Sequence, residues 1–214
     1  MLILGIILMI PIVNFIGLGY YLRVISATFA GLNELPEFDE VGDLFINGLK
    51  MFVVAIIYMI IPLILYFLAW IFAVPSATFT TGTAVWYVPF YAFSAVSWIL
   101  FALALILGLL FGLMYYIGIA NMALYEGELG AALRFSEILD RINAIGWGTF
   151  IIWYIVFIVV SAVVATVIGI IGIILLFILI GILVFIIGYG YLSMFQARSV
   201  ALLFASSEED LEPE

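Results

Sequence analysis

The run "INAIGWGTFIIWYIVFIVVSAVVATVIGIIGIILLFILIGILVFIIGYGYLSMFQA" (Ile142 to Ala197) contains no charged side chain. An α-helix needs about 20 apolar residues to cross a bilayer core that is roughly 30 Å thick. The run is therefore long enough for two crossings joined by an uncharged turn, which we place at Gly169 and Gly172. It predicts transmembrane helices over about residues 147–168 and 173–200.

Two more charge-free segments come earlier in the chain. Residues 1–22 are long enough for one crossing, and residues 51–125 for two crossings with a connection between Pro75 and Pro89. Proline and a cluster of hydroxyl side chains make helix unfavourable through that connection. We therefore predict an all-α integral membrane protein with about five transmembrane helices. The three further spans cover about residues 2–24, 51–73 and 90–122.

The composition agrees with a membrane protein and excludes several kinds of chemistry. Hydrophobic residues make up 69% of the chain and charged residues only 9%, which leaves too few polar side chains to cover a soluble domain. Cysteine and histidine are absent, so disulfides, thiol catalysis, imidazole acid–base chemistry and Cys/His metal sites are excluded. No phosphate-binding glycine loop or G-x-S-x-G motif occurs. We expect a non-enzymatic protein with no cofactor, no metal site and no nucleic-acid partner.

With five crossings, every charged side chain falls on one side of the membrane. The basic residues on that side are Arg23, Lys50, Arg134, Arg141 and Arg198. Because positive charge in short loops marks the cytoplasmic face, we predict a multi-pass protein of the cell membrane with its N-terminus outside. The C-terminus is then cytoplasmic and ends in an acidic tail over residues 206–214.

Two short amphipathic helices are expected on the charged side, over about residues 37–49 and 130–143. In the second, Phe135, Ile138, Leu139 and Ile142 recur at helical spacing. Such a helix lies flat in the interface with its apolar side on lipid or on the bundle, and its acids are solvated. A hard-cation site among the five acids between Glu34 and Asp43 is the alternative, although their order differs from that of a calcium-binding loop.

The chain also shows weak self-similarity. "RVISATFAG" (Arg23 to Gly31) resembles "IANMALYEG" (Ile119 to Gly127), and "FDEVGD" (Phe38 to Asp43) resembles "FSEILD" (Phe135 to Asp140). We interpret residues 1–205 as one transmembrane domain built from a parallel repeat, residues 1–73 and 90–168, followed by a fifth helix. Convergence on a shared interfacial chemistry is the competing explanation.

The quoted blocks support a family resemblance. "GYYLRVISATFAG" and "LPEFDEVGDLFINGLK", between Gly19 and Lys50, resemble an archaeal multi-pass membrane family known as domain of unknown function 4013. "ALYEGELGAALRFSEI" (Ala123 to Ile138) is similar to a second conserved block of that family. The resemblance implies a helical membrane protein of archaeal origin. Because the family has no established activity, it assigns no functional residues.

We favour a membrane scaffold or accessory subunit that presents an acidic face to a cytoplasmic or membrane protein partner. Arg23 and Arg198 are expected to anchor helix ends to lipid headgroups. The carboxylates expected to meet the partner are Glu37, Asp39, Glu40, Asp43, Glu137 and Asp140.

The alternative function is a transporter or lipid-handling protein for neutral or amphiphilic molecules, since no ionisable residue lies at mid-membrane. Its cavity would be lined by Asn14, Asn121, Ser94 and Ser97. Small residues four apart also allow close helix packing, within the chain or between copies. These small residues are Ala104, Gly108 and Gly112 in one span, and Ser161, Ala165 and Gly169 in another.

Overall fold

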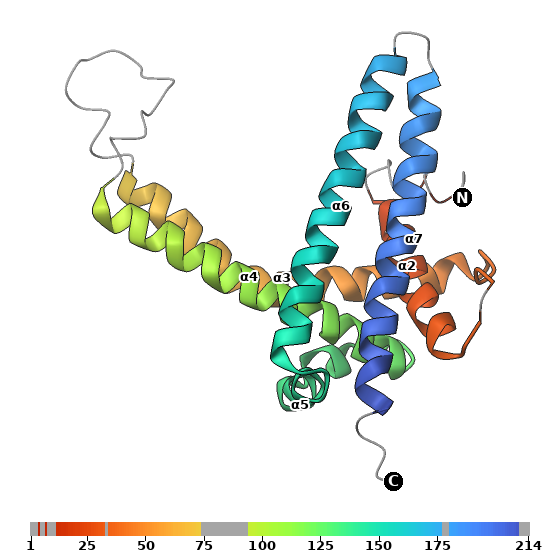
Figure 1. The fold of residues 1–214 in the computed structure, drawn as a ribbon, viewed down its shortest axis with the longest axis horizontal. Helices are drawn as coiled ribbons and strands as arrows, with labels where there is room; N and C mark the ends of the chain where they lie inside the picture. The colour runs from red at the N-terminus through yellow and green to blue at the C-terminus, as the bar shows by residue number, and fades with distance from the viewer. Residues whose placement is uncertain are drawn as a thin grey trace. The chain divides into compact units, whose positions relative to one another are not determined.

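The computed structural model describes residues 12–32, 34–73, 94–176 and 180–209, together with Leu4 and Ile7. Within these residues the chain is helical and contains no strand, which confirms the predicted all-α class (Figure 1). The elements in chain order are α2 (Asn14–Phe29), α3 (Val41–Ala73), α4 (Ala95–Leu124), the 3₁₀ helix η3 (Leu129–Leu133), α5 (Phe135–Ile145), α6 (Trp147–Leu176) and α7 (Ile180–Glu209).

Four of the described helices are long and apolar enough to cross a membrane: α3, α4, α6 and α7. They match four of the five predicted spans. The remaining span, residues 2–24, is described mainly where it enters α2, which continues to Phe29. The connection between Pro75 and Pro89 and the end of the acidic tail lie outside the described residues. The protein is therefore a helical membrane protein with at least four helices of spanning length among its described residues.

The first amphipathic segment, residues 37–49, is not a separate helix as predicted. Helix α3 begins at Val41 and runs without a break to Ala73, with Pro62 inside it. The segment instead forms the first turns of a transmembrane helix. Its Gly48 lies against the backbone of α2, because a Cβ atom there would sit 1.7 Å from the carbonyl oxygen of Phe15. Phe45 of this segment packs on Phe15 of α2, with ring centroids 5.8 Å apart, whereas Val41 and Leu49 remain exposed.

The predicted turn at Gly169 and Gly172 is also wrong, because α6 continues through both glycines to Leu176. Gly172 serves a different purpose. A Cβ atom on it would lie 2.5 Å from Cζ of Phe185 on α7, so the missing side chain makes room for that ring. Glycine in a membrane helix often permits such close contact between neighbours rather than a break.

The second amphipathic segment, residues 130–143, is confirmed as the 3₁₀ helix η3 followed by α5. Ile138 and Ile142 are fully buried, and α5 packs on α6 and α7. Phe135 and Leu139 remain about 40% exposed, so the buried stripe is narrower than the sequence pattern. The sequence left open whether the apolar side of this segment lies on lipid or on the helix bundle. The structure shows that its two central residues, Ile138 and Ile142, are buried against the bundle.

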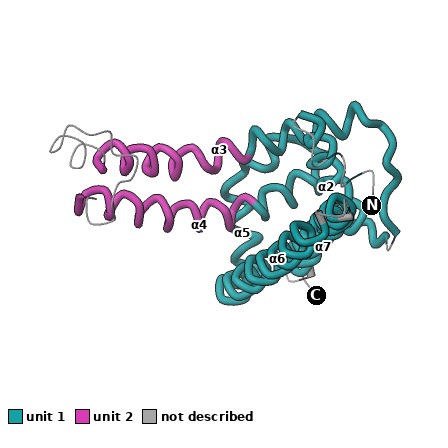
Figure 2. Tube along the Cα trace, turned by 90° about the horizontal axis from the view of Figure 1, so that it is seen from above, with its two compact units in different colours: residues 1–54, 116–214 teal, residues 55–115 magenta. Residues whose placement is uncertain are grey.

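The chain divides into two compact units (Figure 2). Unit 1 comprises residues 1–54 and 116–214, and α7 is its central helix, in contact with α2, α5 and α6. Unit 2 comprises residues 55–115, where α3 and α4 pair as an antiparallel hairpin. Ring contacts between Tyr58 and Tyr115 and between Tyr66 and Phe101 set the register of this hairpin. The predicted repeat, residues 1–73 and 90–168, stays a prediction.

Candidate functional site

The charged side chains of unit 1 form two clusters. In the first, Arg23 on α2 reaches the extended segment that precedes α3. Its Nη1 atom donates hydrogen bonds to the backbone oxygens of Glu37 (3.0 Å) and Asp39 (3.2 Å) and forms an ion pair with the Asp39 carboxylate. Its Nη2 atom lies 3.1 Å from Oε2 of Glu40. We call Arg23, Glu37, Asp39 and Glu40 the Arg23 cluster.

The Arg23 cluster is supported by Tyr20, one turn earlier on α2. The Tyr20 hydroxyl donates a 2.8 Å hydrogen bond to the Pro36 oxygen, and its ring lies 5.1 Å from the Phe38 ring. Glu40 adopts a left-handed backbone conformation with φ +47°, and its carbonyl oxygen accepts the first amide bonds of α3. Left-handed geometry is costly for a residue with a Cβ atom. The contacts to α2 therefore hold the start of α3 in place.

The second cluster surrounds Arg134, between η3 and α5. Its guanidinium forms ion pairs with Glu128 (2.9 Å) and Glu137 (3.7 Å) and lies 4.5 Å above the Tyr125 ring. The Tyr125 hydroxyl donates a 3.0 Å hydrogen bond to Oε1 of Glu137. These contacts stabilise the turn between α4 and α5. They also pair Glu137, one of the carboxylates predicted to meet a partner, with groups of the protein itself.

The other three basic residues also have partners inside unit 1. Lys50 donates to the backbone oxygen of Gly127 (2.9 Å) just past the end of α4, where a cation is favoured by the helix dipole. Arg141 lies 4.8 Å above the Phe204 ring. Arg198 donates a 3.1 Å hydrogen bond to the Leu32 oxygen. Headgroup anchoring by Arg23 and Arg198 stays a prediction.

The acids are divided by these contacts into two sets. Among the described residues, the ion pairs use only Asp39, Glu40, Glu128 and Glu137. The exposed carboxylates of the second set take part in none of these ion pairs. They are Glu34, Glu37, Asp43, Glu126 and Asp140. Across the described part of the chain, no three acidic side chains are grouped closely enough to hold a metal ion.

The polar residues predicted to line a transport cavity have local roles. In unit 1, Asn121 is fully buried, and its Nδ2 atom donates a 2.9 Å hydrogen bond to the Ala131 oxygen. In unit 2, the Ser94 hydroxyl accepts from the Ser97 amide at 3.1 Å and caps the start of α4. Asn14 begins α2. Ser94 therefore stabilises a helix end, and Asn121 stabilises the contact between α4 and η3.

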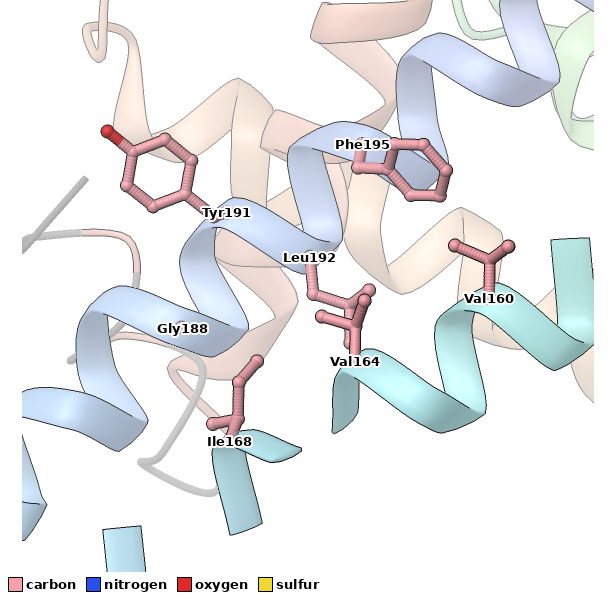
Figure 3. A pocket seen from close by; sticks show the side chains of 7 residues that line it. All are labelled: Val160, Val164, Ile168, Gly188, Tyr191, Leu192 and Phe195. Atoms are coloured by element: carbon pink, nitrogen blue, oxygen red, sulfur yellow. The ribbon is translucent and has the colours of Figure 1, made fainter. Parts of the chain in front are cut away.

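Each unit also carries an apolar groove. The groove of unit 1 lies between α6 and α7 and has a volume of about 420 Å³ (Figure 3). The groove of unit 2 lies between α3 and α4 and measures about 460 Å³. The unit 1 groove is lined by Val160, Val164, Ile168, Gly188, Tyr191, Leu192 and Phe195. Apart from the tyrosine in each groove, Tyr191 and Tyr66, these linings are hydrocarbon and suit a hydrocarbon chain.

Two features of the site were not predicted from the sequence. The first is the pairing of Arg23 with Asp39 and Glu40, which requires the chain to reverse direction after α2. Opposite charges about sixteen residues apart in the sequence are only a weak signal for such a pairing. The other is an aromatic cluster in unit 2, where the Phe101 ring lies 6.0 Å from Trp70 and 6.2 Å from Trp98. Aromatic side chains near the ends of two adjoining spans were available as a signal for the second feature.

Comparison with known proteins identifies a family and nothing more specific. The family model described as "Protein of unknown function (DUF4013)" matches residues 3–175, which is more than half of the chain. No curated protein and no solved structure matches the chain. The match spans α2 to α6, with the Arg23 and Arg134 clusters and the groove side of α6. The chain belongs to the DUF4013 family, a family of proteins of unknown function.

Proposed function

We propose that this protein is a non-enzymatic membrane scaffold or accessory subunit that binds a basic partner protein. The binding surface is the charged end, by which we mean the part of unit 1 that carries the Arg23 and Arg134 clusters and the exposed acids near them. In this proposal the charged end faces the cytoplasm and the N-terminus lies outside the cell, because the basic residues share that end. The partner is a soluble or membrane protein with Lys and Arg side chains on its contact surface.

The observation that supports the proposal is that the basic side chains all have partners within the protein, whereas several of the described acidic side chains do not form ion pairs. All five basic side chains have partners within unit 1, while Glu34, Glu37, Asp43 and Asp140 are exposed and take part in none of the ion pairs found among the described residues. A contact with a carbonyl oxygen or an aromatic ring does not neutralise a cation, but the 14 acids of the chain outnumber its 5 basic residues, so this surface carries a negative potential. Such a potential attracts a positively charged surface and rejects an acidic one.

The proposal is tested with two variants that remove the same amount of charge. Glu37→Gln combined with Asp43→Asn removes two carboxylates outside the ion pairs, whereas Glu128→Gln combined with Glu137→Gln removes two that pair with Arg134. The readout is native mass spectrometry of protein extracted gently from its own membrane. We expect a stoichiometric second polypeptide with the wild type and with the second variant, but not with the first.

The binding should also weaken as salt rises, since exposed charges are screened beyond about 8 Å at physiological ionic strength. A wild-type protein that is extracted alone, or a partner that both variants retain equally, would contradict the scaffold proposal.

The apolar groove between α6 and α7 supports the alternative function, handling of lipid or another amphiphile. Gly188 permits close contact between α6 and α7 along the groove, because an added Cβ atom there would meet Ile168 at 2.8 Å, and Val164 of α6 also lines the groove. Val164→Phe should fill the groove, and native mass spectrometry should then show fewer co-purified lipids than with the wild type. Equal lipid occupancy in the two proteins would remove this alternative.

A further inference from the structure

Helix α5 buries only part of its apolar side in the bundle. Ile138 and Ile142 are fully buried where α5 packs on α6 and α7, whereas Phe135 and Leu139 are exposed. On a helix with 3.6 residues per turn, Leu139 lies about 60° from Ile142 and about 40° from Phe135. The two exposed residues therefore form a second apolar strip beside the buried one. We call Phe135 and Leu139 the outer strip of α5.

The outer strip continues into α6 through Trp147. Gly146, with φ +84°, is the single residue between the two helices, and α5 lies across the foot of α6 (Figure 1). Trp147 is the first residue of α6 and is exposed. Its Nε1 atom donates a 2.8 Å hydrogen bond to Oδ1 of Asn143, which lies one turn after Leu139. The outer strip and the first turn of α6 therefore form one continuous surface.

The exposed apolar surface of α6 begins at its first turn and does not fade toward α5. Ile151 and Ile155 follow Trp147 at intervals of four residues and are exposed, and the neighbouring Ile152 is 65% exposed. On α7, Leu202 is 63% exposed although it lies close to the end of that helix. Exposure of this much apolar surface is costly in water and not in lipid. Because α6 and α7 are long and apolar enough to span a membrane, lipid should reach the level of Trp147.

We propose that α5 is an interfacial helix, whose buried strip binds the helix bundle and whose outer strip binds the lipid surface of the membrane. Amphipathic helices of this kind bury their apolar side about 5–10 Å into the boundary between headgroups and acyl chains. Trp147 then lies at the same boundary, where tryptophan is enriched because its ring is apolar and its N–H group polar. Continuity with α6 favours lipid over a protein as the occupant, because the same exposed surface runs on to a helix that lipid surrounds.

The polar side of α5 is oriented as this position requires. Asp140 is exposed and lies about 100° from Leu139 and about 160° from Ile142 around the helix. It therefore points away from both the bundle and the outer strip. A helix lying in the interface keeps this carboxylate in water, where its charge is not penalised. The inference does not depend on the partner of the scaffold proposal.

The proposal is tested with single cysteines that carry a nitroxide spin label, since the chain has no cysteine of its own. The purified protein is placed in phosphatidylcholine vesicles, with a polar nickel chelate on both sides of the membrane. EPR then measures how often the label collides with dissolved oxygen, which concentrates in lipid, and with the chelate, which stays in water. Leu139 is the test position, Asp140 the water-facing control and Ile155 the lipid-facing control on α6.

The ratio of oxygen to chelate collisions should be at least about fivefold higher for Leu139→Cys than for Asp140→Cys, and close to that of Ile155→Cys. Phe135→Cys should behave like Leu139→Cys and takes its place should that variant fail to accumulate. Equal ratios at Leu139 and Asp140 would place the outer strip in water and overturn the proposal. Infrequent collisions with both reagents at Leu139 would show that protein covers the strip, which overturns it as well.

Discussion

Gly19 of α2 and Gly48 of α3 face each other at a backbone contact between the two helices. A Cβ atom on Gly19 would lie 1.8 Å from the Leu44 oxygen, and one on Gly48 would lie 3.0 Å from the Gly19 nitrogen. Neither position has room for any side chain. This contact holds the first turns of α3, and with them Asp43 and Lys50, against α2.

Alanine at Gly19 or Gly48 should therefore destabilise the protein. A methyl group would overlap backbone atoms that have no rotamer to move into, so the helices must separate at a cost of about 1–3 kcal/mol. The measurement is thermal unfolding in detergent micelles. Gly42→Ala is the control, because an added Cβ atom there meets nothing within 4 Å. A Gly19→Ala protein as stable as Gly42→Ala would show that the helices are not this close.

Replacement of Arg23 should free the segment that precedes α3. Arg23→Gln removes both ion pairs of the Arg23 cluster, to Asp39 and Glu40. Hydrogen exchange of the amides between residues 35 and 44 should become faster, since the start of α3 loses its support. Exposed ion pairs contribute at most about 1 kcal/mol, so the effect should be local and leave the global unfolding temperature nearly unchanged.

Arg134→Gln is the matched control for that measurement, because Arg134 pairs with Glu128 and Glu137 instead. It should speed exchange around α5 and leave residues 35–44 as they are. Identical exchange patterns in the two variants would contradict separate roles for the two clusters.

Glycine at position 126 should stabilise the protein. Glu126 has φ +50° just past the end of α4 and is exposed. A left-handed conformation is unfavourable for a residue with a Cβ atom, and an acid is unfavourable near the negative end of a helix dipole. Glu126→Gly removes both effects and should raise the free energy of unfolding by about 1 kcal/mol. Glu126→Ala, which removes only the charge, should gain less; equal gains would assign the whole effect to the dipole.

Lys50 should contribute to the stability of the protein mainly through its hydrogen bond and less through its charge. Its Nζ atom donates to the Gly127 oxygen, across 77 residues of sequence. Lys50→Met keeps the apolar stem but leaves that oxygen without its donor, so we expect a loss of about 1–2 kcal/mol in thermal unfolding. Lys50→Arg retains a donor and should lose less. A Lys50→Met protein with wild-type stability would show that water replaces the ammonium group.

The gaps between charged residues were sufficient to predict four spanning helices. An uncharged segment of about 20 residues has few alternatives to crossing a membrane, whatever it packs against. The helical spacing of Ile138 and Ile142 likewise predicted α5, because a buried stripe must repeat with the period of the helix. The same reasoning failed at Gly169 and Gly172. Glycine permits either a turn or a close helix contact, and only the position of Phe185 on another helix distinguishes the two.

The sequence by itself therefore determined the fold class and the four helices of spanning length. These properties follow from solvation, which acts on each segment separately. The tertiary structure decided that residues 41–49 join α3, that Arg23 pairs with Asp39 and Glu40, and that Glu37, Asp43 and Asp140 stay outside the ion pairs. Those outcomes depend on which segments meet after the chain has folded, and contacts between distant residues leave no periodic signal in the sequence.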